Sequence, residues 1–230
     1  MNAAGDRGPQ TGPDAAVVDL LGVLACGELL AFERLAHDAA LAPTIEDKAE
    51  LARMAVAEFT HFTTLREHLV KIGVDPAAAM APFVEPLGDF HRRTAASNWL
   101  EGLVKAFVGD GLAADFYREI SGYLDPATAA LVSEVLADTG LSAFAVEHVR
   151  AAIEADPRVA GPLALWGRRL MGEALTQAQR VAAEREVLTA LIVGGTGDDR
   201  PGIDLNELGA LLGRLTAAHS ERMAALGLEA

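Results

Sequence analysis

Four acidic residues stand where the apolar stripes of predicted helices should carry leucine: Glu28, Glu58, Asp110 and Asp138. His61 follows Glu58 in a Glu-x-x-His motif, whose spacing directs a carboxylate and an imidazole from one side of a helix. Buried acids normally pair with cations or bind metal ions, because an unpaired carboxylate in a dry core is strongly unfavourable. These stripes contain no Lys or Arg. The five residues are therefore predicted to bind metal.

A simpler interpretation stays open for each residue. The acids would then lie partly exposed at helix boundaries or in a hydrogen-bonded network without metal, and His61 would be a satisfied core histidine. We favour metal binding because the two acids of each predicted hairpin are equidistant from its turn. Cys26 is interpreted as a small core residue and Tyr117 as core or support, while His91 shows no pattern above a surface background.

The register follows from the geometry of helical hairpins, in which residues equidistant from the turn lie at the same height. Glu28 and Glu58 have their midpoint at Pro43, the predicted turn, and Asp110 and Asp138 have theirs at residue 124. Each hairpin should therefore place its two acids side by side. By helical rotation, Glu33 and Asp115, which follow the acids by five residues, are expected to face solvent.

The elements that must position these residues are all helical. Ala, Leu, Glu and Arg favour helices, and no strand-like alternation is sustained. Capping residues and Pro/Gly stops predict six helices, at 14–41, 44–72, 98–123, 125–156, 162–193 and 204–227. Residues 73–97 are expected to form a crossover with at most a helical turn at 89–93. The prediction is a disordered lead at 1–13, a four-helix bundle at 14–156 and a helical pair at 157–230, which either covers the bundle or forms a dimer interface.

Composition narrows the function classes. The 230 residues are 51% hydrophobic and carry a formal net charge of −14, which argues against a generally basic, nucleic-acid-binding surface. Uncharged apolar runs are too short to predict a membrane span. One cysteine excludes an internal disulfide and fits a reducing cytoplasm.

Four segments carry a family resemblance: GVLACGELLAFERLA, AVAEFTHF, LVKAFVGDGLAADFYREI and VLADTGLSAFAVEHVRAAI. Over residues 14–156 the chain resembles the ferritin-like superfamily, and more narrowly bacterial proteins similar to the prenylated-adenosine tRNA hydroxylase, a non-haem di-iron monooxygenase. The resemblance implies a ferritin-like four-helix bundle, and the two additional C-terminal helices that the residue pattern predicts fit it only loosely. It also implies the ligands Glu28, Glu58, His61, Asp110 and Asp138, two of them aspartates where the family has glutamates.

The sixth ligand position departs from the family pattern, because Leu141 stands where a second histidine is expected. The second metal would then have carboxylates alone or be missing. His148 lies too far along the helix to replace that histidine, and we expect it to face His68 one layer away.

The resemblance implies iron, two ions or one, with manganese as an alternative. The implied activity is oxygen-dependent hydroxylation of an unknown small-molecule or modified-RNA substrate, with an electron donor as partner. The competing hypothesis is a metal-poor bundle that acts as a non-catalytic interaction or scaffold protein. A homodimer is one further expectation.

Overall fold

The computed structural model describes residues 14–192 and 205–230, and within them the chain is all-helical, without strands. The α-helices are α1 (Ala15–Asp38), α2 (Ile45–Lys71), α3 (Pro76–Arg93), α4 (Trp99–Ile120), α5 (Pro126–Val135), α6 (Leu141–Ala155), α7 (Ala160–Glu184), α8 (Glu186–Ile192) and α9 (Leu205–Ala225). The predicted all-α bundle is therefore confirmed. The predicted lead at 1–13 and residues 193–204 lie outside the described residues.

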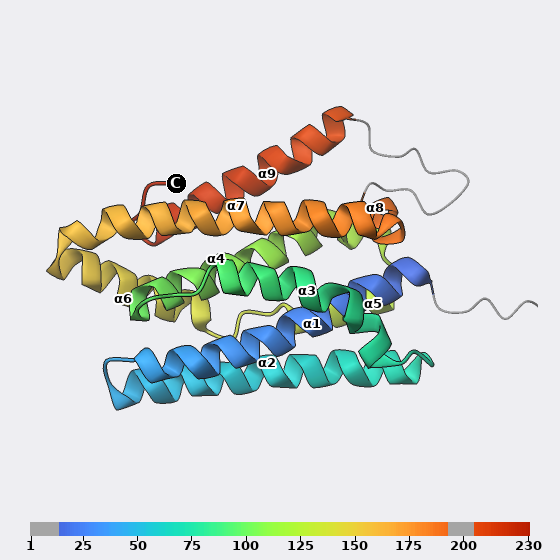
Figure 1. The fold of residues 1–230 in the computed structure, drawn as a ribbon, viewed down its shortest axis with the longest axis horizontal. Coiled ribbons are helices and arrows are strands. Elements are labelled where there is room, and N and C mark those ends of the chain that lie inside the picture. The colour runs from blue at the N-terminus through green and yellow to red at the C-terminus, as the bar shows by residue number, and fades with distance from the viewer. Residues whose placement is uncertain (1–13, 193–204) are drawn as a thin grey trace, which may run out of the picture.

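The first hairpin forms as predicted. Thr44 caps α2 by accepting a hydrogen bond from the Asp47 amide, and the chain turns at Pro43. Figure 1 shows α1 and α2 running antiparallel along one edge of the molecule, with α7 along the other side. Helix α1 lies between α2 and α3, and α4 packs against α6, α7 and α9.

The crossover prediction is wrong, because residues 76–93 form a complete helix, α3. Asp75 accepts a hydrogen bond from the Ala77 amide and Pro76 occupies the first turn, the same arrangement that begins α5 at Asp125. Two internal prolines argued against a helix locally. Packing of buried Ala79 and Phe83 outweighs that local preference.

Two predicted helices are divided in the structure. The expected helix at 125–156 is interrupted between α5 and α6, where Gly140 has a φ of +96°. The expected helix at 162–193 is interrupted at Arg185, between α7 and α8. There the Arg185 guanidinium pairs with buried Asp19 of α1, with Nε 2.9 Å from Oδ2.

The segment Ala15–Leu41 is long and apolar enough to cross a membrane by length and composition alone. A core helix of a bundle meets the same criteria, and α1 packs against α2, α3 and α8. It also carries the buried acids Asp19, Glu28 and Asp38.

Candidate metal centre

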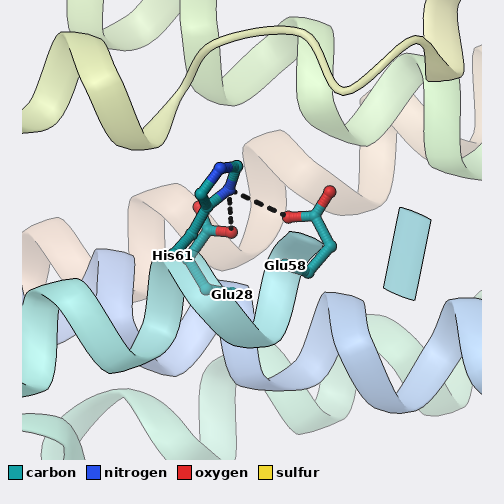
Figure 2. Close-up of side chains that lie close together, drawn as sticks. All are labelled: Glu28, Glu58 and His61. Carbon is teal, nitrogen blue, oxygen red and sulfur yellow. Dashed lines mark ion pairs between the residues drawn. The ribbon is translucent and has the colours of Figure 1, made fainter. Parts of the chain in front are cut away.

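Glu28, Glu58 and His61 meet in the interior, where α1 faces α2. One ligand atom from each lies within 4.8 Å of the others. His61 Nδ1 is 3.5 Å from Glu28 Oε2 and 3.7 Å from Glu58 Oε2, as Figure 2 shows. The two acids are only 7% and 6% exposed. The sequence prediction that these three side chains come together is confirmed by their geometry.

Apolar packing on both sides of the group fixes its register. Leu21 and Ala25 of α1 share a core cluster with Leu65 of α2. Beyond the acids, Leu35 of α1 shares another cluster with Leu51 and Met54. A slip of either helix would remove these contacts from the core, so the acids cannot separate without a loss of burial.

The three groups share protons in a way that depends on their mutual contact. Burial, reinforced by Glu58, raises the pKa of Glu28 to about 9. The pKa of Glu58 is lowered despite its burial, because His61 and Glu28 stabilise its charged form. Contact with Glu28 and Glu58 raises the pKa of His61 to about 10. At neutral pH the trio therefore holds one neutral acid, one carboxylate and one imidazolium.

The donor set fits a metal ion. Glu28 Oε2 and His61 Nδ1 are buried and have no hydrogen-bond partner among the described residues. Two carboxylates and an imidazole suit iron or manganese better than metals that prefer thiolates. An ion between them would engage both of these atoms. That these residues are ligands stays a prediction.

Asp110 lies on α4, on the wall of the cavity that the trio also lines, but outside the group of three. Desolvation by the surrounding protein atoms, then the charges of Glu58 and Asp138, raise the pKa of Asp110. Asp110 is nevertheless exposed, so the expectation that it is a buried acid on its helix stripe is wrong. Asp110 is thus electrostatically coupled to the trio across an open space.

Asp138 does not occupy a buried helical stripe, so the expected helical position is wrong. It lies in the segment between α5 and α6 and is exposed, although it lines the cavity. Its Oδ1 accepts hydrogen bonds from the Gly140 amide at 3.0 Å and the Ser142 amide at 3.4 Å. The left-handed Gly140 breaks the helix, and the Asp138 carboxylate satisfies amides that the break leaves free.

Three further expectations concern residues outside the trio. Leu141 is buried in the core at the start of α6. The expected His68–His148 pair is wrong, because Nδ1 and Nε2 of His148 lie 2.9 Å from the Phe144 carbonyl and from Asp47 Oδ1 respectively. Asp115 is buried rather than solvent-facing.

The burial of Asp115 is compensated by two arginines, which the apolar stripe of its helix did not predict as partners. Arg222 of α9 pairs with it from across the helix interface, and Arg118 Nη1 lies 2.8 Å from Oδ1. Glu33, by contrast, is exposed as predicted. Cys26 is buried in the core, and the Tyr117 hydroxyl donates a hydrogen bond to the Ala129 carbonyl, 2.6 Å away.

A cavity of about 490 Å³ connects the candidate ligands. All five predicted ligand residues line it, and most other lining side chains are aliphatic or aromatic, from α1, α3, α4, α7, α8 and α9. Its size lies within the usual range for small-molecule sites. Sequence reasoning missed Arg34, His91 and Lys105, which line the same cavity. None of the three lies on the apolar stripes that carry the acids, so the stripe pattern gives no signal for them.

Comparison with known proteins agrees with the helical arrangement. A family model described as a ferritin-like domain of actinomycetes matches residues 12–195. The chain belongs to this ferritin-like family. The family is broader than the tRNA-hydroxylase-like group, so that narrower resemblance stays a prediction.

The ferritin-like chain is also similar to a solved structure, "Protein 19 with aldehyde deformylating oxidase activity from Synechococcus". The TM-score is 0.68 at 22% identity, with 94% of this chain and 91% of the other covered. At this identity the likeness establishes the fold alone. No match is found among curated proteins.

Proposed function

We propose that this ferritin-like chain is an oxygen-dependent metalloenzyme that oxidises a small, largely apolar substrate. The observation that carries the proposal is that Glu28, Glu58 and His61 form a buried donor group that opens into an apolar cavity of about 490 Å³. A metal centre with an adjoining apolar cavity suits the oxidation of an unactivated carbon, because a substrate that fills the cavity would displace water from the reacting atoms. The oxidase activity named for the Synechococcus protein supports the same reaction class.

In this proposal Glu28, Glu58 and His61 hold the first ion. Asp110 approaches from α4 and is the candidate carboxylate for a second. Bound iron supplies the reduction of dioxygen and the oxidation of the substrate. Hydroxylation converts a C–H bond, O₂, two electrons and two protons into C–OH and water, so an electron-donor partner is required.

In this proposal the ligands also release protons, and the cavity walls bind the substrate. Glu28 and His61 must release their protons when an ion enters, since their pKa values are raised in its absence. The aliphatic walls orient the substrate and keep water away. Manganese, which accepts the same oxygen and nitrogen donors, is the alternative metal.

The number of ions follows from the second half of the site. Leu141 supplies no ligand, and Asp138 Oδ1 accepts hydrogen bonds from the Gly140 and Ser142 amides, so the second ion has fewer protein donors than the first. We therefore expect a tight ion at the trio and a weaker one, if any, at Asp110.

An apolar cavity of about 490 Å³ favours a small molecule over the modified RNA implied by the tRNA-hydroxylase-like resemblance. The metal-poor scaffold remains the second candidate, and the incomplete second half of the site is the observation that favours it. A scaffold would bind no ion stoichiometrically and would show no oxygen-dependent change.

Metal binding tests the proposal directly. The full chain, stripped with chelator, is titrated anaerobically with Mn(II) or Fe(II), and bound metal is measured per chain. We expect one or two ions for the wild type and none at the tight site for Glu58→Gln. Glu50→Gln is the matched control, since Glu50 is a partly exposed acid on the same helix that pairs with Arg53.

Asp110→Asn and Asp138→Asn distinguish the second site. We expect Asp110→Asn to remove the weaker ion, and Asp138→Asn to leave metal content unchanged. Less than about 0.2 ions per wild-type chain under saturating metal, with no ultraviolet change when oxygen meets the Fe(II)-treated protein, would refute the enzyme proposal and favour the scaffold.

A further inference from the structure

Three basic side chains, Arg34, His91 and Lys105, gather at one end of the apolar cavity. They come from α1, α3 and α4 respectively, and all three line the cavity wall. Lys105 is 3% exposed, which is unusual for a lysine. None of the three belongs to the candidate metal centre.

The antiparallel packing of α1 and α4 places this basic group relative to the metal ligands. Leu35 and Val104 share one core cluster, and Leu20 and Ile120 share another. Arg34 lies six residues beyond Glu28, which is about 9 Å along the helix axis. The cavity therefore has basic groups at one end, the candidate ligands in the middle and an apolar far end at Leu20 and Ile120.

The basic end has more positive charge than its surroundings neutralise. Lys105 Nζ donates to the Thr94 carbonyl at 2.7 Å and lies 5.3 Å from the centre of the Phe90 ring, but neither is an anion. Arg34 Nη1 is 3.4 Å from Asp38 Oδ1, a long contact for an ion pair. Asp38 also acts on Lys105 electrostatically, but it does not line the cavity. Two basic groups against this one acid leave at most one uncompensated positive charge.

Two further observations mark this end as incomplete. His91 Nδ1 is buried and has no hydrogen-bond partner among the described residues. Burial, then the charge of Arg34, lower the pKa of Lys105 to about 7. Burial, then Lys105 and Arg34, lower the pKa of His91 to about 3, so His91 is neutral and offers a ring N–H. An anion between these side chains would satisfy donors that the protein leaves unused.

We infer that Arg34, His91 and Lys105 bind the carboxylate of a single-chain amphipathic ligand, whose apolar chain passes the candidate metal ligands toward Leu20 and Ile120. A carboxylate fits better than a phosphate, because Arg34 and Lys105 against Asp38 leave at most one uncompensated positive charge. The site places the head group about two helical turns from Glu28, so carbons within the chain, not the head group, lie beside the candidate ligands. The last point rests on the proposed function; the binding of the carboxylate does not.

The test compares ligands that share one chain and differ in the head group. Decanoate, 1-decanol and decylamine are titrated into the full chain by calorimetry, with and without Mn(II). We expect the wild type to prefer decanoate, and Lys105→Met to weaken decanoate by about tenfold or more with little change for decanol. Lys71→Met, an exposed lysine on α2, is the control for net charge.

Arg34→Met is the second variant, used if Lys105→Met does not fold, and circular dichroism checks both. Equal affinity of the wild type for decanoate and decanol, or equal losses for both ligands in Lys105→Met, would overturn the inference. Preferred decanoate binding by a chain that binds no Mn(II) would overturn the proposed function alone. Stoichiometric Mn(II) without a decanoate preference would overturn the carboxylate site alone.

Discussion

Glu28 is a buried acid, lies beside a second acid and is a candidate metal ligand. Its carboxyl is buried beside Glu58, and a second negative charge at that distance is unfavourable without a cation. In the metal-free protein, protons on Glu28 and His61 remove this charge repulsion. A divalent ion would replace both, so protons and metal compete for the same atoms.

A pH-dependent stability difference follows from this competition. The raised pKa of Glu28 means that the folded state keeps a proton that the unfolded state loses above its ordinary pKa of 4.5. This contribution is fully present below pH 4.5 and is lost as pH rises through about 9. We therefore expect Glu28→Gln, which stays neutral, to gain in Tm over the metal-free wild type as pH rises from acid to alkaline, by several degrees.

Thermal melts in chelator at a series of pH values measure that difference. Lys105 and His91, whose pKa values are lowered, act in the opposite direction but cancel between the two proteins. The raised pKa of His61 depends on Glu28, so it adds to the difference in the same direction. Glu33→Gln is the control, an exposed acid on the same helix, and its difference from wild type should stay flat. A flat difference for Glu28→Gln as well would show that the carboxyl is not held neutral by burial.

The residues of the trio could be predicted from the sequence because helical spacing and hairpin symmetry are local rules. Glu28, Glu58 and His61 needed only two uninterrupted helices and a turn at Pro43. The same rules gave a wrong position for Asp138, because Gly140, in a left-handed conformation, interrupts the helix that was expected to continue through it. Arg34, His91 and Lys105 could not be grouped in advance, since their meeting depends on α3, a helix that the sequence did not predict.

At the scale of elements, α3 is the main addition to the predicted bundle. It lies so close to α1 that a Cβ at Gly22 would collide with the Ala79 carbonyl and touch the Phe83 ring. Glycine is required there by the close approach of two backbones. The prolines of α3 concealed this helix, whereas the Asp75-Pro76 pair, read like Asp125-Pro126, would have indicated it.

The substitution Gly22→Ala tests the close packing of α1 and α3, because the added Cβ should force the two helices apart. We expect a loss of about 1 to 3 kcal/mol in the free energy of unfolding, because the neighbouring atoms are backbone and cannot move aside. Urea denaturation measures it. Gly172→Ala in α7, whose Cβ would meet nothing within 4 Å, is the matched control and should be neutral or stabilising by up to about 1 kcal/mol. Equal effects for the two variants would contradict the close α1–α3 packing.

At the scale of the whole molecule, the C-terminal helices help to form the cavity as well as the core. Met171 of α7, Leu188 of α8 and Leu215 of α9 line the same space as the acids of α1 and α2. No stripe pattern could show this, because an apolar helix face looks the same whether it lines a cavity, a core or a dimer interface. The division into domains and the homodimer stay predictions.

The distribution of charge over the molecule bears on the substrate. The chain carries a net charge of −14, while Arg34 and Lys105 are turned into an apolar cavity and not toward a surface groove. RNA binding depends on neutralising many phosphates along an accessible face, and an acidic surface repels them. A cavity of about 490 Å³ also holds a small ligand more readily than a stacked nucleotide within a folded RNA.

We therefore expect the metal-loaded protein to leave bulk tRNA unbound at about 0.15 M salt. Filter binding of labelled tRNA over a range of protein concentrations measures this, with a basic RNA-binding protein as the positive control. Lowering the salt separates the alternatives, because phosphate contacts strengthen steeply as salt falls. Saturable binding whose affinity falls with salt as steeply as several phosphate contacts require would favour the modified-RNA substrate. The basic end of the cavity would then have to bind a group other than the head group of the substrate.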